Sequence, residues 1–164
     1  MSTANPVAPC DFVVFGGTGD LAVRKLLPAL YLRDRDGQLP AQTRIIAASR
    51  EGLDISGYRD SVRGELGRFV AHDAIDQQTL DRFIARLDYA SIDFADPDGW
   101  HPLTTLLPAD PGKVRVFYLA CAPSLFGPIS AHLATHKLVD RSSTRPRSAR
   151  PAQIGPKSSG AQAR

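Results

Sequence analysis

A glycine-rich junction between an apolar run and a helical pattern constrains the fold of this 164-residue chain more than any other feature. Residues 11–15 read Asp-Phe-Val-Val-Phe, a short β-branched run that predicts a buried strand. Gly16 and Gly17 end the run, and a helical pattern opens at Asp20. A strand buried on both faces suits a parallel sheet. This junction therefore indicates an α/β chain.

The same alternation of strand and helix continues along the chain. Further strands are predicted over residues 44–50, 89–94 and 114–120. Helices are predicted over residues 20–36, 55–70, 75–87, 97–107 and 124–138. Asp96 is expected to cap the fourth helix, and Pro28 to kink the first or free one of its carbonyls. Alternation of this kind predicts a Rossmann-like parallel sheet with helices on both faces.

The charge of the chain is unevenly distributed, which divides it into three segments. Residues 141–164 carry six Lys or Arg and no acid, whereas residues 1–140 carry 14 basic and 17 acidic side chains. This terminal segment holds only five apolar residues and is expected to be disordered. We predict a flexible N-terminus over 1–9, a folded domain over 10–140 and a disordered basic tail over 141–164. The basic balance belongs to the tail, so no nucleic-acid partner is expected.

Composition also excludes several classes of protein. No run of 18 apolar residues exists, and residues 1–10 lack a basic stretch followed by an apolar one, so neither a membrane span nor a secretory signal is expected. The two cysteines, Cys10 and Cys121, form no CxxC motif. Neither a disulfide framework nor a cysteine metal site is therefore expected. A cytoplasmic location, where thiols stay reduced, is expected.

The junction contains Gly17-x-Gly19-x-x-Ala22, which matches the dinucleotide-binding fingerprint G-x-G-x-x-G/A. In that fingerprint the first glycine allows the tight turn, and the second lets the backbone approach the pyrophosphate. Alanine then keeps the helix close to the strand, and the helix N-terminus offers free N–H groups to phosphate. The alternative is a plain tight turn. Asp20 is expected either to cap the helix or to contact the cofactor.

The end of the second predicted strand indicates which dinucleotide binds. NAD sites usually present an acidic residue here, whereas arginine accommodates the 2′-phosphate of NADP. This chain has Ser49-Arg50, and a guanidinium binds phosphate through two hydrogen bonds. Arg50 therefore favours NADP. Glu51 follows it, so strict exclusion of NAD is not predicted.

Residues 16–30 read GGTGDLAVRKLLPAL and closely resemble the N-terminal signature of the glucose-6-phosphate dehydrogenase family. The resemblance continues through residues 45–50, 115–120 and the Ala122-Pro123 turn, and spans about residues 10–140. It implies oxidation of glucose 6-phosphate at C1 to the lactone, with hydride passed to NADP, in cytoplasmic homo-oligomers. Lys25 matches a family lysine near the cofactor and substrate phosphates.

The resemblance also implies the remaining cofactor-binding residues. The pyrophosphate would lie on Gly16, Gly17, Thr18, Gly19, Asp20, Leu21 and Ala22. Arg50 would bind the 2′-phosphate. The nicotinamide side would be lined by Leu119, Ala120 and Pro123, and Asp93 and Phe94 would lie near the adenine. No metal site is implied.

The chain departs from the family after its last predicted helix. The family continues with an E-K-P-x-G strand that contacts substrate, where residues 143–148 read Ser-Thr-Arg-Pro-Arg-Ser. None of the four histidines lies in a recognisable catalytic motif, so no catalytic residue is assigned. We expect an incomplete, inactive copy whose tail is read out of frame, or else a natural short protein with a basic tail. A stand-alone NADP-binding or sensing module is the alternative function.

Overall fold

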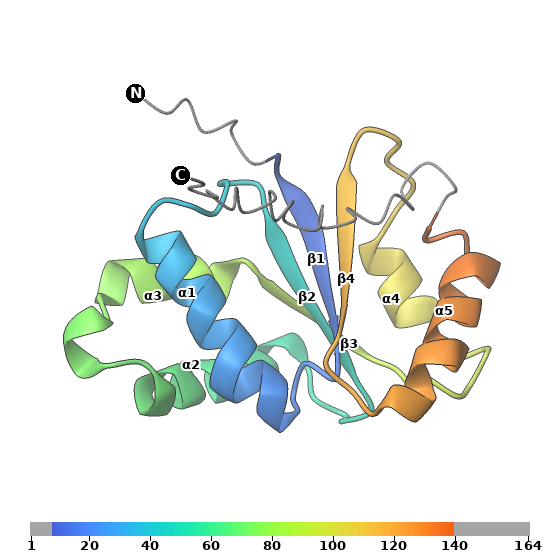
Figure 1. Ribbon diagram of the computed structural model, residues 1–164, viewed down its shortest axis with the longest axis horizontal. Helices are drawn as coiled ribbons and strands as arrows, with labels where there is room; N and C mark the ends of the chain where they lie inside the picture. The colour runs from blue at the N-terminus through green and yellow to red at the C-terminus, as the bar shows by residue number, and fades with distance from the viewer. Residues whose placement is uncertain (1–7, 140–164) are drawn as a thin grey trace, which may run out of the picture.

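The computed structural model describes residues 8–139 and contains one four-stranded parallel sheet with the order β3-β2-β1-β4 (Figure 1). Its strands are β1 (Cys10–Phe15), β2 (Arg44–Ser49), β3 (Leu87–Ser91) and β4 (Val114–Leu119). The chain runs outward from β1 to β3 and then returns to pair β4 with β1. The expected basic tail, and the expected flexible N-terminus up to residue 7, lie outside the described residues.

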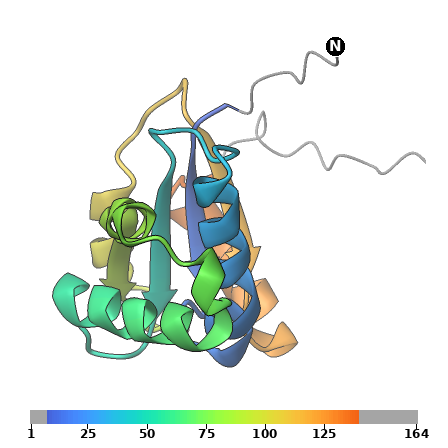
Figure 2. The ribbon, with the colours of Figure 1, turned by 90° about the vertical axis from the view of Figure 1, so that its left-hand side faces the viewer.

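Helices cover both faces of the sheet, as the strand–helix alternation predicted. One face carries α1 (Leu27–Arg35), α2 (Ile55–Phe69) and α3 (Gln77–Ala85), and Figure 2 shows these helices in front of the strands. The other face carries α4 (His101–Leu106) and α5 (Phe126–Thr135). Three short turns complete the list: η1 (Ala22–Leu26), η2 (His72–Ala74) and η3 (Pro123–Leu125).

Two hydrophobic cores form because successive strand residues point to opposite faces of the sheet. Val14 of β1 and Ala47 of β2 lie in the core beneath α1, α2 and α3. Phe15 and Ala48, one residue further on, lie in the core beneath α4 and α5. Trp100 fills this second core, fully buried, with its ring 5.7 Å from that of Phe15.

The sequence placed β3 two residues too late. Leu87 was assigned to the preceding helix, but it is fully buried in β3 and pairs with Ile45 of β2. Helix α3 ends at Ala85 instead of residue 87. The expected strand also ran on to residue 94 because Ile92 and Phe94 keep the apolar alternation. Both side chains turn into the second core after the strand has ended.

Two helix boundaries on the second face also differ from those predicted. Asp96 does not cap a helix: its side chain accepts a hydrogen bond from the backbone N–H of Asp98 at 3.0 Å, within a turn. Helix α4 begins only at His101, with proline in its first turn. The expected helix over 124–138 starts as a 3-10 turn, and α5 itself ends at Thr135. Its chain reverses through Lys137, which adopts φ 54°.

Pro28, which we expected to kink the first helix or to free one of its carbonyls, is accommodated by a wide turn. A proline within a helix lacks an N–H group and clashes with the carbonyl one turn back. Residues 22–26 therefore form a π-helical turn, in which the N–H of Leu27 donates to the carbonyl of Ala22. The regular helix α1 follows, and Gly37 at φ 68° ends it. The carbonyls of Arg33 and Asp34 accept from Gln38 and Gly37, which satisfies the last turn.

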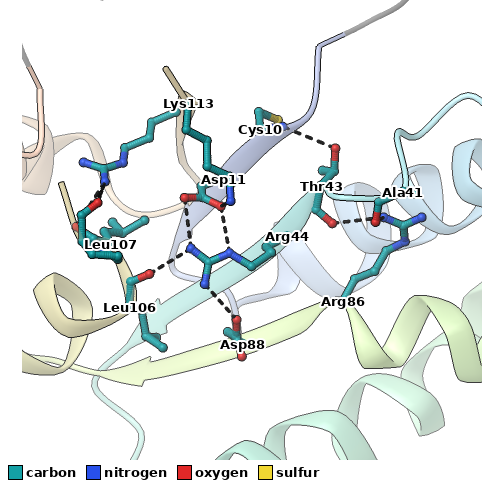
Figure 3. Close-up of polar contacts among 12 residues, drawn as sticks. Cys10, Asp11, Ala41, Thr43, Arg44, Arg86, Asp88, Leu106, Leu107 and Lys113 are labelled. Carbon is teal, nitrogen blue, oxygen red and sulfur yellow. Dashed lines mark hydrogen bonds and ion pairs between the residues drawn. The ribbon is translucent and has the colours of Figure 1, made fainter. Parts of the chain in front are cut away.

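Charged side chains join the amino ends of the strands (Figure 3). Asp11 of β1 is almost fully buried and accepts two hydrogen bonds from Arg44 of β2, at 2.9 and 3.0 Å. Lys113, just before β4, lies 2.8 Å from the same carboxylate. Arg44 also donates to the carbonyl of Leu106 at 2.9 Å and pairs with Asp88 of β3 at 3.6 Å. This cluster, which we call the Asp11 cluster, links β1, β2 and β3 with α4 and with the residue that precedes β4.

Candidate functional site

The turn that leaves β1 is built from glycines for steric reasons. Gly16 has φ +84°, and a Cβ there would lie 2.5 Å from the carbonyl oxygen of Ala120. Gly17 crosses β2 so closely that a Cβ would lie 2.4 Å from the Cβ of Ala47. The sequence interpretation gave the tight turn to Gly17. The positive φ belongs instead to Gly16, and Gly17 serves the close approach to β2.

A helix N-terminus follows the turn directly. The first helical hydrogen bond runs from the N–H of Val23 to the carbonyl of Gly19, at 3.0 Å. The preceding N–H groups of Asp20, Leu21 and Ala22 have no backbone acceptor within residues 8–139, as at any open helix N-terminus. Asp20 does not cap the helix, since its carboxylate pairs with Arg24 at 2.6 Å instead. The amides therefore stay available to an anion.

A cavity of about 550 Å³ lies at the carboxyl ends of the strands, beside this turn. It is lined by Gly16, Thr18, Gly19, Ser49, Arg50, Glu51, Phe94, Ala120, Cys121 and Leu125. Strand order reverses between β1 and β4, and open parallel sheets bind ligands in the crevice at such a switch point. The cavity therefore occupies the position at which this class of sheet binds its ligand.

The structure brings together six of the residues predicted from the sequence. Those lining the cavity are Gly16, Thr18, Gly19, Arg50, Phe94 and Ala120. The other eight do not line it: Gly17, Asp20, Leu21, Ala22, Lys25, Asp93, Leu119 and Pro123. Gly17 and Ala22 are buried beneath the loop, whereas Leu21, Lys25 and Asp93 are exposed. Of the two residues expected near the adenine, Phe94 lines the cavity and Asp93 does not.

Several lining residues were not assigned from the sequence. Cys121 and Leu125 reach the cavity from the turn that follows β4, whose path depends on tertiary packing. Burial raises the pKa of the Cys121 thiol, so it stays neutral. Ser49 and Glu51 flank Arg50 and share its turn. Their position beside Arg50 was the signal that could have identified them.

The turn that carries Arg50 is held from β3. The hydroxyl of Tyr89 donates to the carbonyl of Glu51 at 2.6 Å and lies 2.6 Å from the hydroxyl of Ser49. Burial raises the pKa of Tyr89, a shift that the hydrogen bond from Ser49 opposes without cancelling, so the phenol keeps its proton. The Tyr89 ring stacks on that of Tyr58, with centroids 4.9 Å apart. Tyr58 in turn donates to the carbonyl of Gly17 at 3.3 Å.

These features fit a dinucleotide. The backbone at Gly16 and Gly17 leaves no room for a side chain, and amides without a backbone acceptor among the described residues follow at the helix N-terminus, a combination suited to binding a pyrophosphate. Arg50 is exposed at the end of β2, where a ribose of the dinucleotide would lie. Within residues 8–139, no group of three or more His, Cys, Asp or Glu side chains could hold a metal ion.

Sheet order, glycine turn and cavity together define a dinucleotide-binding domain of the Rossmann class. The family model described as "Glucose-6-phosphate dehydrogenase, NAD binding domain" matches residues 13–147. The chain belongs to the glucose-6-phosphate dehydrogenase family.

Similar proteins agree with this assignment. Glucose-6-phosphate 1-dehydrogenase of Mycolicibacterium smegmatis is 54% identical over 145 residues, which is 86% of this chain and 29% of that protein. The enzyme of Rhizobium meliloti is 44% identical over 136 residues, 83% of this chain and 28% of that protein. The chain thus spans less than a third of the length of these relatives.

Solved structures show the same fold. Glucose-6-phosphate 1-dehydrogenase from Mycobacterium avium superposes with a TM-score of 0.72 at 29% identity, over 82% of this chain and 28% of that one. A glucose-6-phosphate dehydrogenase in complex with glucose 6-phosphate gives a TM-score of 0.68 at 26% identity, over 83% of this chain and 30% of that one.

No helix within residues 8–139 is both long and apolar enough to cross a membrane.

Proposed function

We propose that this chain binds NADP as the coenzyme-binding part of a glucose-6-phosphate dehydrogenase. The observation that carries the proposal is the cavity at the β1–β4 switch point, where the glycine turn and Arg50 line one space. The pyrophosphate would lie on the amides after Gly19, and Arg50 would bind the 2′-phosphate. When bound, NADP supplies the acceptor for a hydride from C1 of glucose 6-phosphate.

Arg50 provides the test of cofactor choice. Hydrogen bonds to charged groups contribute roughly 1.5–3 kcal/mol, so R50A should weaken NADP by that amount and leave NAD nearly unchanged. Calorimetric titration with both nucleotides measures the two affinities. R63A is the matched control: Arg63 on α2 pairs with Asp81 at 2.8 Å and does not line the cavity. Equal weakening of NADP and NAD by R50A would contradict the proposal.

Removal of the C1 hydroxyl proton requires a base beside the substrate. No histidine lines the cavity among the described residues. His132 of α5 and His136, directly after that helix, lie instead against Trp100, at 5.1 and 5.7 Å between ring centroids. We therefore propose that the chain binds NADP but does not by itself turn over glucose 6-phosphate.

The assay for this second statement is NADPH formation by the purified 164-residue chain, produced in a host without its own dehydrogenase. Binding of NADP without turnover is the expected result and also fits the stand-alone NADP-binding module. Turnover would show that a base lies in this chain after all. We also propose a cytoplasmic location, where the free thiols of Cys10 and Cys121 would stay reduced.

A further inference from the structure

Tyr89 belongs to a closed ring of hydrogen bonds around Arg50. The N–H of Glu51 donates to the hydroxyl of Ser49 at 3.3 Å, and the hydroxyl of Tyr89 donates to the carbonyl of Glu51 at 2.6 Å. The hydroxyls of Ser49 and Tyr89 lie 2.6 Å apart. The ring therefore holds the residue on each side of Arg50 and leaves the Arg50 side chain itself exposed.

The proton direction in this ring follows from valence. A phenol has one proton to donate, and Tyr89 uses it on the Glu51 carbonyl. Ser49 must then donate to the oxygen of Tyr89, which accepts. Each hydroxyl both accepts and donates, an arrangement in which neighbouring hydrogen bonds strengthen one another. Loss of the Tyr89 hydroxyl would open the ring at two points.

The aromatic side chain of Tyr89 is held in turn by stacking on that of Tyr58. The two aromatic planes lie at 24° with centroids 4.9 Å apart, and Tyr58 is almost fully buried. Tyr58 reaches the phosphate side of the site through its hydrogen bond to Gly17. The tyrosine pair thus connects the backbone of the glycine turn with the backbone around Arg50.

We propose that Tyr89 is a positioning residue for cofactor choice: its hydroxyl fixes the turn that presents Arg50 to the 2′-phosphate of NADP. The inference rests on the proposed function, since it assumes that Arg50 binds this phosphate. Ordering a flexible side chain or loop upon binding weakens affinity, and a turn fixed beforehand avoids that loss. Because NAD lacks the 2′-phosphate, the benefit falls on NADP alone.

The test compares Y89F with Y58F in titrations with NADP, NAD and adenosine 2′,5′-bisphosphate, which carries adenosine with its 2′- and 5′-phosphates and lacks the nicotinamide half. Y89F keeps the aromatic stack and removes the hydroxyl. We expect its Kd for NADP and for the bisphosphate to rise about fivefold to tenfold, with NAD unchanged. Y58F removes a hydroxyl beside the glycine turn, so it should affect NADP and NAD equally.

A double-mutant cycle with R50A separates positioning from a general structural role. If Tyr89 acts through Arg50, adding Y89F to R50A causes no further loss of NADP affinity. S49A opens the same ring at another member and should reproduce the Y89F pattern. NMR relaxation of the Glu51 amide, without nucleotide, should show increased motion in Y89F.

The outcomes distinguish the inference from the function on which it rests. If the wild-type chain binds no NADP, or R50A leaves the ratio of NADP affinity to NAD affinity unchanged, the proposed function fails and the inference fails with it. If R50A lowers that ratio but Y89F and S49A do not, the inference alone is overturned. Additive losses in the cycle, or equal losses of NADP and NAD in Y89F, also overturn it.

Discussion

Polar groups are paired within the protein at the amino end of the sheet, whereas at its carboxyl end backbone amides are left without a backbone acceptor in the part of the chain that the structure describes. At the amino end, buried Asp11 accepts hydrogen bonds from Arg44 and Lys113, so charged side chains neutralise one another inside the protein. At the carboxyl end, Gly16 and Gly17 leave no room for side chains, and backbone amides stay open at the helix N-terminus.

This difference separates stability from binding. A buried charge must be matched internally, which the Asp11 cluster achieves by closing the amino ends of the strands. The carboxyl end places its partial positive charge where an external anion can reach it. Loss of the Asp11 cluster should therefore lower stability, whereas blocking the open amides should lower nucleotide affinity. Gly16 and Gly17 pack closely against the Ala120 carbonyl and β2, so their substitution should also lower stability. The following experiments test this division.

Substitution of Gly16 by alanine should have the largest effect. A left-handed backbone conformation costs a non-glycine residue about 1–2 kcal/mol, and the new Cβ would also lie 2.5 Å from the Ala120 carbonyl. We expect G16A to lose more than about 3 kcal/mol of unfolding free energy, or not to fold. Urea denaturation, monitored through the fluorescence of Trp100, the one tryptophan of the chain, measures the loss.

Gly37 supplies a matched control for this experiment. It has φ +68°, and a Cβ there would meet nothing within 4 Å. G37A should therefore lose only about 1 kcal/mol, from backbone strain alone. Equal losses for G16A and G37A would show that the contact with Ala120 does not shape the turn.

Asp11 provides the corresponding test at the amino end. Removing one partner of a buried ion pair leaves the other uncompensated, which typically costs about 3–5 kcal/mol. Arg44 and Lys113 stay partly exposed, so we expect D11N to lose about 2–3 kcal/mol. Chemical denaturation measures this loss. D81N, which breaks the exposed pair with Arg63, should change stability by less than about 1 kcal/mol.

The pH dependence of stability gives a second measure of the Asp11 cluster. Burial raises the pKa of Asp11, but the hydrogen bonds from Arg44 and Lys113 outweigh burial and hold this pKa below the ordinary value of an aspartate side chain. Protonation therefore favours the unfolded chain. The contribution is fully present above about pH 4 and is lost as pH falls through the folded-state pKa. Wild type should lose stability more steeply than D11N below pH 4, and parallel curves would contradict this origin.

Gly19 should affect binding much more than stability. A Cβ at Gly19 would lie 3.1 Å from the carbonyl of Gly16, which a small shift can relieve, and its φ is not positive. The methyl group would however lie where the backbone approaches the pyrophosphate. We expect G19A to weaken NADP and NAD about tenfold each while the circular dichroism spectrum stays like that of wild type. Unchanged affinity would reduce the loop to a plain turn.

The pair between Asp20 and Arg24 should contribute least. Both side chains are mostly exposed, at 76% and 55%, and they are four residues apart along the helix. Such pairs contribute about 0.3–0.5 kcal/mol. D20N should therefore shift the urea midpoint only slightly, and less so in high salt. A loss above about 1 kcal/mol would mean that Asp20 caps the helix in solution.

The alternation of strands and helices, and the glycine turn between the first strand and the first helix, could be predicted because they depend on local pattern and sterics. The end of β3 could not, since Ile92 and Phe94 continue the alternation of a strand while packing beyond it. Within the candidate site, Arg50 followed directly from its position after β2. Cys121, Leu125 and Tyr89 did not, because their approach depends on how β3 and the turn after β4 pack in three dimensions.

The π-helical turn over Ala22–Leu26 has a consequence for insertions and deletions. Each residue of an α-helix advances the side-chain direction by about 100°. The wide turn adds one residue to the helical path. The rotation of α1 about its axis, relative to the segment before the turn, therefore depends on the length of the turn. Removing one residue from the turn would rotate Leu27 and Tyr31 away from their core and would bring Pro28 against the carbonyl one turn back. Length changes here should therefore be selected against more strongly than substitutions.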